Sequence, residues 1–360
     1  MDDRTTLLRP PPPDPSKAPI ENVLEVTELA VLGPDIFTNA RKPWHPPGAR
    51  GIYGGAVIAM CLAAGQRTVP DDFNVHSLHA YFLLAGSGQL PILFHVERVR
   101  DGRSFATRTV QARQKGRCIF TTTISFVREG SSGKPGSQAS HSSPMPRGGG
   151  GGDDDDDGQQ PLRSPPDDFD GEPELIKQGP FQSDRIEIVN RDSVHAHEKK
   201  TRQWFRARGK IAGGTPAHLA ALAYVSDSYF IGTVSRIHRL WRFPFNAKEY
   251  DDLPADVKTK VRTLHEWEGL GSDPRDMVGQ PVVGMMVSLD HSIYFHEPCK
   301  VRADEWMLNE MESPWAGDGR GVVTQKIFSK DGTLIATCVQ EGIIRLKEEA
   351  KLEEDKGSKL

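Results

Sequence analysis

The stretch V-S-L-D-H-S-I-Y-F-H-E-P, residues 287–298, alternates between apolar and polar side chains. Read with a period of two, one face holds Val287, Leu289, His291, Ile293 and Phe295, and the other holds Ser288, Asp290, Ser292, Tyr294 and His296. This alternation, ended by a proline, predicts a strand that is buried on one side. The hydroxyls, carboxylate and imidazole of the second face suit the wall of a polar site, and an ordinary solvated face would look the same.

A near copy of this stretch lies upstream. Residues 76–82, H-S-L-H-A-Y-F, correspond to residues 291–296, H-S-I-Y-F-H, and the two starting histidines are 215 positions apart. In each half of the chain an apolar helix precedes strand-like segments. Tight turns are expected between these segments at dipeptides such as Asp101-Gly102, Lys115-Gly116 and Asp331-Gly332. Two copies of an antiparallel sheet curled around a long helix predict an α+β double hotdog fold.

The expected elements follow this repeat. In the first half we expect a first strand over residues 21–32, a helix opened by Gly54-Gly55 and running through Ala64, and strands over 75–84, 92–100, 104–114 and 118–127. In the second half we expect a strand over 201–211, a helix over 215–230, and strands over 286–295, 305–312, 321–329 and 334–346.

Composition predicts the domain boundaries. We expect a disordered Pro-rich tail over residues 1–19, a first hotdog over 20–128, a disordered linker over 129–173, a second hotdog over 174–347 with an insertion at about 236–284, and a tail over 348–360. The linker contains five aspartates in a row, Asp153–Asp157. Such a run beside polyglycine is more typical of a solvated segment than of a metal site.

Composition also excludes several classes of function. The formal net charge of −4 and the scattered basic residues give no reason to expect nucleic-acid binding. The four cysteines form no C-x-x-C pair and no N-x-S/T sequon is present, so we expect no metal and a reducing intracellular compartment. The longest apolar run, Ala56–Ala64, is too short to span a membrane, which takes about 20 residues. The final residues Ser358-Lys359-Leu360 predict import into the peroxisome matrix through its receptor.

Three residues could perform chemistry together. On a helical wheel Asp227 lies on the apolar side of its predicted helix, where burial raises a carboxyl pKa and favours a general base. Gln340 lies among small side chains on its predicted strand, where its amide needs partners, and Glu341-Gly342 could bulge the strand to aim it. Ser288 is on the polar face described above. For each of the three, a purely structural role is the alternative.

Other catalytic frameworks are missing from the sequence. It has no G-x-S-x-G elbow, no G-x-G-x-x-G and no P-loop, so an α/β-hydrolase and nucleotide-phosphate chemistry have no support. We therefore expect no cofactor.

Several motifs together resemble the acyl-CoA thioesterase II family, which includes a bacterial enzyme and its peroxisomal relatives. They are Gly54-Gly55-Ala56-Val57, Val75–Leu83, Arg100–Phe105, Tyr224-Val225-Ser226-Asp227, Leu289–His296 and Val339-Gln340-Glu341-Gly342. The resemblance covers both halves but leaves out the N-terminal tail, the linker and the insertion. It implies a double hotdog that hydrolyses fatty acyl-CoA to a fatty acid and CoA.

The resemblance also assigns residue roles. The family's catalytic acid falls on Asp227, its glutamine on Gln340, and its hydroxyl residue, a threonine in the bacterial member, on Ser288. Gly54 and Gly55 are candidates for substrate contact, and the family's glutamine after them is Ala56 here. His76, which matches a histidine once suspected of catalysis, is a weaker candidate, and a structural role suits it better.

The expected mechanism is direct attack of a water on the acyl-CoA thioester, with Asp227 as base and with Ser288 and Gln340 orienting the water. A non-hydrolytic acyl-CoA-binding relative and a peroxisomal enoyl-CoA hydratase are the alternatives. Hotdog sheets commonly pair edge to edge, so a homodimer or higher oligomer is also possible.

Overall fold

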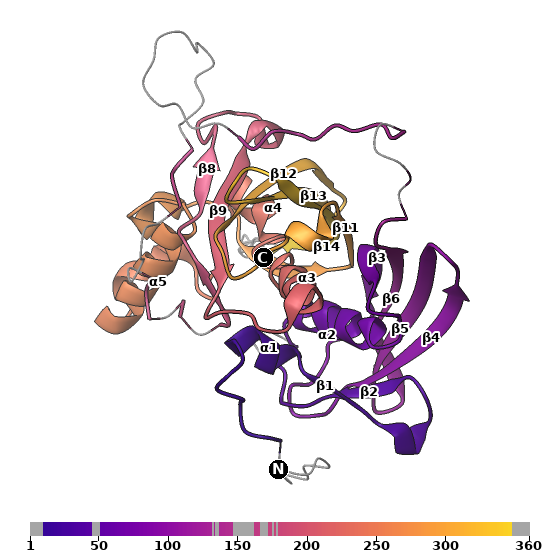
Figure 1. The fold of residues 1–360 in the computed structure, drawn as a ribbon. Coiled ribbons are helices and arrows are strands. Elements are labelled where there is room, and N and C mark those ends of the chain that lie inside the picture. The colour runs from indigo at the N-terminus through magenta and orange to yellow at the C-terminus, as the bar shows by residue number, and fades with distance from the viewer. Residues whose placement is uncertain are drawn as a thin grey trace, which may run out of the picture.

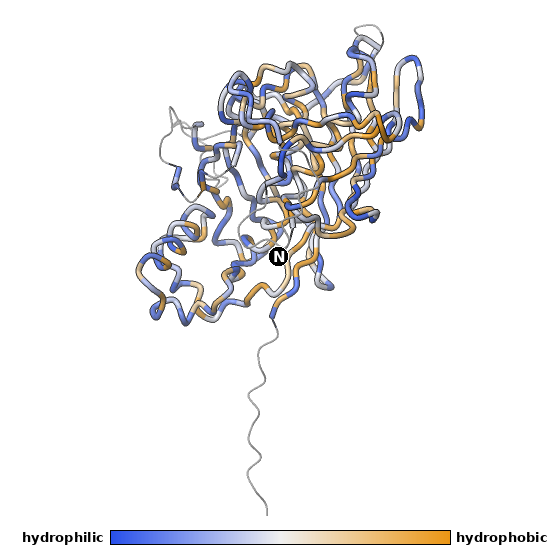
Figure 2. The backbone as a smooth tube through the Cα atoms, turned by 90° about the horizontal axis from the view of Figure 1, so that it is seen from below, coloured by the Kyte–Doolittle hydropathy of each residue, from blue (hydrophilic) through white to orange (hydrophobic). Residues whose placement is uncertain are grey.

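The computed structural model describes residues 10–44, 51–131, 133, 137–146, 162–165, 172–174, 176–177 and 179–347. Within these ranges the chain forms two halves of similar architecture, in which strands curl around a central helix (Figure 1). Along the strands, hydrophobic and hydrophilic residues alternate (Figure 2). This alternation lets each sheet face its helix on one side and solvent on the other.

The N-terminal half is an antiparallel sheet around helix α2, Gly54–Gln66. Ten of the thirteen residues of α2 are buried, because its circumference is apolar on nearly every side. The strands are β1 Val26–Glu28, β2 Ile36–Asn39, β3 Phe73–Phe82, β4 Leu93–Asp101, β5 Phe105–Gln114 and β6 Arg117–Arg128. Strands β3 to β6 begin and end within two residues of the predicted bounds.

The C-terminal half repeats this plan around helix α3, Gly214–Val225. Its strands are β7 Phe181–Ser183, β8 Glu187–Val189, β9 Lys200–Ala207, β10 Val283–Ser288, β11 Asp290–Phe295, β12 Met307–Gly317, β13 Arg320–Ser329 and β14 Leu334–Leu346. Strand β14 has the predicted bounds, and β12 runs five residues beyond them.

Pairing of β3 with β11 joins the two halves into one fourteen-stranded sheet. Its main path has the order β1-β2-β4-β5-β6-β3-β11-β14-β13-β12-β9-β7, with β10 paired to β14 and β8 to β9. At the join Leu78 lies opposite Ile293, and both side chains are fully buried. These residues are 215 positions apart, the offset of the sequence repeat, so an approximate two-fold axis passes between them. Helices α2 and α3 lie side by side across this axis (Figure 1), and the double hotdog prediction is confirmed.

Residues 287–295 are divided between two strands, β10 and β11, so the prediction of one unbroken strand is wrong. Leu289 lies between β10 and β11. Ser288 pairs with Gly342 and Ser292 pairs with Val339 on the same partner strand β14, so four steps on one side match three on the other. One extra residue of this kind reverses which side chains face the core.

Beyond this break the polar face is an ordinary solvated one. Tyr294 and His296 are exposed, and Ser292 accepts or donates a hydrogen bond with the exposed His79 at 3.0 Å. Ile293 and Phe295 are buried on the opposite face, as predicted. A polar site on this strand must therefore lie on its inner face, which holds the buried residues His291, Ile293 and Phe295.

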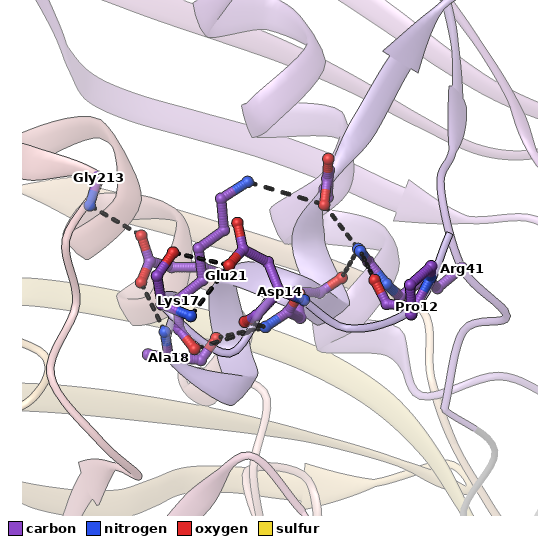
Figure 3. A network of polar contacts seen from close by, with 10 residues as sticks. Pro12, Asp14, Lys17, Ala18, Glu21, Arg41 and Gly213 are labelled. Atoms are coloured by element: carbon purple, nitrogen blue, oxygen red, sulfur yellow. Dashed lines mark hydrogen bonds and ion pairs between the residues drawn. The ribbon is translucent and has the colours of Figure 1, made fainter. Parts of the chain in front are cut away.

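The start of the chain differs from the prediction. A strand was predicted over residues 21–32, but Pro19–Leu24 forms helix α1 and only the short strand β1 follows. Proline is well suited to a first helical turn, and Ile20 and Leu24, four residues apart, both face the core. Residues 10–18, predicted as disordered, are held by contacts such as that from the Arg41 guanidinium to the Pro12 carbonyl (Figure 3).

Glu21 connects this N-terminal helix to the second half of the molecule (Figure 3). Its carboxylate accepts backbone hydrogen bonds from Ala18 at 2.9 Å, Ala212 at 3.1 Å and Gly213 at 2.8 Å. Gly213 is the residue that caps the start of α3. A carboxylate at this position is stabilised by the unpaired amides and the dipole of the helix.

Parts of the predicted linker are ordered on the C-terminal half. Met145 and Leu162 pack against a cluster of buried residues that includes Trp204 and Trp306. The Trp204 indole donates a hydrogen bond to the Arg163 carbonyl at 2.7 Å. The prediction of disorder therefore does not hold for these segments, which contribute side chains to the core, while Asp153–Asp157 lies outside the described residues.

The predicted insertion has its own small core. Helix α4, Gly232–Ile237, leads into it, and α5, Ala255–Trp267, projects from one side of the molecule (Figure 1). The buried cluster consists of Trp241, Ala247, Tyr250, Val261 and Met277. Among the described residues, no helix is long and apolar enough to cross a membrane.

We expect Glu21→Ala to lower the free energy of unfolding by about 1–2 kcal/mol, because three backbone amides lose a charged acceptor. The measurement is the shift of the urea unfolding midpoint. Glu28→Ala is the matched control, because Glu28 is exposed on β1. An equal midpoint for both variants would show that Glu21 does not connect the halves energetically.

Candidate functional site

Asp227 lies in a turn between α3 and α4 rather than inside the predicted helix, which ends five residues earlier than expected. Ser226 ends the helix, and its hydroxyl donates back to the Ala223 carbonyl at 2.9 Å. Tyr229, two residues beyond Asp227, has a left-handed backbone with φ of 59°. The turn lets the Asp227 carboxylate leave the axis of α3 and reach the other half of the molecule.

The partner of Asp227 in the other half is the start of α2. Its Oδ2 accepts a hydrogen bond from the Gly55 backbone amide at 2.9 Å. A Cβ atom on Gly54 would lie 2.7 Å from this oxygen and 2.9 Å from the Phe82 ring, and one on Gly55 would collide with the Tyr224 carbonyl. The two glycines are therefore required for the close approach of α2 to the carboxylate.

Gln340, on β14, contacts the second oxygen of the carboxylate. Its Nε2 donates to Asp227 Oδ1 at 2.7 Å and to His291 Nδ1 at 3.0 Å. The residue is completely buried, and its Oε1 has no hydrogen-bond partner among the described residues. A buried amide oxygen without a partner is costly unless a water or a ligand supplies the missing donor.

Burial controls the protonation of Asp227. Removal from water raises the pKa of its carboxyl to about 6, although the hydrogen bonds from Gln340 and Gly55 favour the charged form and act in the opposite direction. At neutral pH the group is therefore mostly a carboxylate, and its pKa is much closer to 7 than the pKa of an exposed aspartate. This combination suits a general base.

Ser288 shares the inner face with Gln340 because of the extra residue at Leu289. It pairs across the sheet with Gly342, which lies two positions from Gln340 on β14 and so on the same face. In a regular ladder such diagonal neighbours are about 7–8 Å apart, with their Cβ atoms somewhat closer. No hydrogen bond joins the Ser288 hydroxyl directly to Asp227 or Gln340 within the described chain.

An open cavity lies near the start of α2. It has a volume of about 520 Å³ and is lined by Lys42, Pro43 and residues 85–89. Gly86 in its wall accepts a hydrogen bond from the Ile52 amide at 3.1 Å, and Ile52 is two residues before Gly54. The residues that line this cavity do not include Asp227, Gln340 or Ser288.

Both halves of the chain match models of known domain families. Residues 40–127 match the model of the acyl-CoA thioesterase N-terminal domain, and residues 157–344 match that of the acyl-CoA thioesterase C-terminal domain. The chain belongs to the acyl-CoA thioesterase II family.

Three relatives illustrate the similarity. Acyl-coenzyme A thioesterase 8 of Homo sapiens is 35% identical over 90% of this chain and 89% of its own. Peroxisomal acyl-coenzyme A thioester hydrolase 1 of Saccharomyces cerevisiae is 24% identical over 91% of this chain and 96% of its own. The solved structure of acyl-CoA thioesterase II TesB2 from Mycobacterium marinum superposes with a TM-score of 0.61 at 28% identity, over 92% of this chain and 99% of that one.

In this member of the family, His291 and Ser226 belong to the polar group around Gln340 and Asp227, although the sequence did not predict it. The alternating pattern places His291 on an apolar face, and Ser226 belongs to the Tyr224–Asp227 motif without a role assigned to it. The His291 Nε2 and the Ser226 Oγ are 3.0 Å apart, and both residues are completely buried. The signal that could have identified His291 is an imidazole on a face that otherwise has only aliphatic and aromatic side chains, because a buried imidazole needs polar partners.

His76 does not join the group formed by Asp227, Gln340 and His291. Its Nε2 lies 2.8 Å from the Ser125 hydroxyl on the neighbouring strand β6, and its ring packs edge-on against Phe105. The register between β3 and β6 shifts at this point, between Val75 and Ser77, so His76 turns away from the buried face that its repeat mate His291 occupies.

We expect Gly54→Ala to lower kcat/KM at least roughly tenfold while the protein still folds, because the added methyl displaces the Asp227 carboxylate, a side-chain group that can move. Gly55→Ala should instead reduce the free energy of unfolding by about 2–3 kcal/mol, because its methyl meets a backbone carbonyl. Activity assays and thermal melts distinguish the two effects.

Gly65→Ala on the same helix is the control. Its nearest neighbour would be the end of the Ile124 side chain at 3.2 Å, which can shift. If Gly54→Ala were as active as this control, the space between α2 and the carboxylate would not matter for activity.

Proposed function

We propose that this chain hydrolyses fatty acyl-CoA to a free fatty acid and CoA by direct attack of a water molecule on the thioester. The observation that supports this most is the Asp227–Gln340 pair, in which a carboxylate of raised pKa lies next to a buried amide oxygen without a partner. The names of the relatives, all acyl-CoA thioester hydrolases, agree with this substrate class.

In the proposed mechanism Asp227 and Gln340 hold one water. One hydrogen of the water is donated to the Asp227 carboxylate and the other to Gln340 Oε1, so that a lone pair points at the thioester carbon. As the carbon–oxygen bond forms, Asp227 takes the proton. The tetrahedral intermediate then expels the CoA sulfur, to which Asp227 returns the proton, and the acid product and the free thiol result.

Ser288 is the third group that we propose for orienting this water. Its place on the inner face, diagonal to Gln340, would put the hydroxyl on the other side of the same solvent molecule. A serine at this position retains the oxygen of the family's threonine.

The start of α2 is the proposed site for the negative charge that develops on the thioester oxygen. The Gly55 amide is engaged by Asp227, whereas no described residue accepts a hydrogen bond from the Gly54 amide. This amide lies at the positive end of a thirteen-residue helix, where an oxyanion is stabilised.

We expect Asp227→Asn to lower kcat for acyl-CoA roughly 10²–10⁴-fold without a comparable change in KM, because the amide cannot accept the proton of the water. In the native protein, kcat/KM should fall tenfold per pH unit below about pH 6, where the carboxyl becomes protonated and loses its function as a base. The assay follows release of the CoA thiol with a thiol reagent.

Asp318→Asn is the matched control, because Asp318 is exposed in the turn before β13. A loss below tenfold for Asp227→Asn, with substrate binding intact, would remove Asp227 as the base. Tight binding of palmitoyl-CoA by the native chain without thiol release would favour the non-hydrolytic alternative, and a change in enoyl absorbance would favour the hydratase.

We further propose that the chain acts in the peroxisome matrix and enters it through the import receptor that binds Ser358-Lys359-Leu360, which lies outside the described residues. The peroxisomal location in the name of the yeast relative agrees with this proposal.

Association of copies through the sheet ends at β1 and β7 is a separate proposal, for which sedimentation velocity is the test.

We expect a fluorescent fusion at the N-terminus to co-localise with a peroxisomal marker, and deletion of Leu360 to release it into the cytosol. Lys356→Ala, just outside the tripeptide, should not change the location. Peroxisomal fluorescence after deletion of Leu360 would show that another signal directs the chain.

A further inference from the structure

We propose that His291 is a positioning residue, which holds the Gln340 amide in the one orientation that presents its oxygen to the attacking water. The inference rests on the proposed hydrolytic function and adds to it a residue with no contact to the substrate. Two hydrogen bonds of the Gln340 side chain and the contacts of the imidazole behind it support this role.

A glutamine amide can be rotated to exchange its oxygen and nitrogen, and the two orientations have opposite consequences here. In the observed orientation both hydrogens of Nε2 are used, one by Asp227 Oδ1 at 2.7 Å and the other by His291 Nδ1 at 3.0 Å. Oε1 is thereby left as an acceptor in a buried position. In the reversed orientation Oε1 would face the carboxylate, and the proposed water would lose its second acceptor.

His291 can play this role because its own orientation is fixed. Since Nδ1 accepts from Gln340, the ring proton is on Nε2, which donates to Ser226 Oγ at 3.0 Å. The Ser226 hydroxyl in turn donates to the Ala223 carbonyl at 2.9 Å. The Phe230 ring packs edge-on against the imidazole with a centroid distance of 5.4 Å. The chain of hydrogen bonds therefore ends on the backbone of α3, next to Asp227 itself.

Burial keeps this histidine a hydrogen-bond acceptor over the working pH range. Removal from water lowers the pKa of His291 to about 3, so the ring is neutral above that pH. A protonated ring would instead direct an N–H toward the Gln340 amide and repel it. The remaining titratable groups close to Asp227 are the phenols of Tyr53 and Tyr224. Burial raises the pKa of each phenol above its ordinary value, so both stay neutral as well.

The same geometry excludes His291 as the base. Both ring nitrogens have protein partners, and the Gln340 amide lies between the imidazole and the Asp227 carboxylate. The imidazole therefore acts through Gln340 and does not touch the water.

The test compares two amide substitutions of His291. In His291→Asn the side-chain amide oxygen falls near the position of Nδ1 and can still accept from Gln340. In His291→Gln the amide group reaches the position of Nε2 and leaves no acceptor near Nδ1. We expect the Asn variant to retain kcat within about fivefold and the Gln variant to lose roughly 10–100-fold in kcat with little change in KM.

The pH profile supplies a readout that a merely structural role would not move. In His291→Gln the Gln340 amide can rotate, so that the Asp227 carboxylate loses the hydrogen bond from Gln340 Nε2 and faces Gln340 Oε1 instead. The charged form of Asp227 is then less stable, and the acid limb of kcat/KM should move above pH 6. His291→Asn should leave the acid limb in place. His296→Asn, an exposed histidine just past β11, is the control for expression and folding, which circular dichroism and thermal melts check.

The outcomes separate this inference from the proposed function. Equal kcat values and equal acid limbs for the Asn and Gln variants would overturn the positioning role, while a large loss in Asp227→Asn would leave the hydrolytic mechanism standing. If Asp227→Asn were active, the mechanism itself would fail, whatever the His291 variants did.

Discussion

The hydrogen bond from the Gly55 amide to the Asp227 carboxylate is the interaction on which the site depends, because it crosses from one half of the molecule to the other. It forms only if α2 and α3 lie side by side, and pairing of β3 with β11 determines that arrangement. Neither half alone holds a complete site. The N-terminal half provides the amides at the start of α2, and the C-terminal half provides the acid, the glutamine and the histidine.

This division explains why the duplicated halves have diverged. Helix α2 contains no acidic residue, whereas the turn after α3 contains Asp227. The glycines at the start of α2 are explained by the same contact, since a side chain on either would occupy the space of the carboxylate or of the α3 backbone. Burial at this junction raises the pKa of Asp227, so the packing that joins the halves also increases the basicity of the residue that we propose as the base.

The architecture was predictable from the sequence. Asp227 and Gln340, which the structure joins by a hydrogen bond, were among its candidate residues, and their catalytic role stays a prediction. The repeat offset, the apolar helices and the alternating strands identified the double hotdog, and a carboxylate and an amide in apolar surroundings identified Asp227 and Gln340. A one-residue irregularity was not predictable, because a period of two assumes an unbroken ladder. The residue at Leu289 places Ser288 and His291 on the same inner face, although an even spacing had assigned them to opposite faces. The start of the chain was misread for a related reason, since Ile20 and Leu24 belong to a short helix whose pattern a loose alternation can imitate.

The most direct measurement is a high-resolution crystal structure of the protein with a thioether analogue of acyl-CoA, which binds as the substrate does but has no bond to hydrolyse. We expect an ordered water within hydrogen-bond distance of both the Asp227 carboxylate and Gln340 Oε1, facing the carbon that replaces the thioester carbonyl. An analogue bound with that carbon away from Asp227, or a Gln340 amide with its oxygen toward the carboxylate, would contradict this expectation.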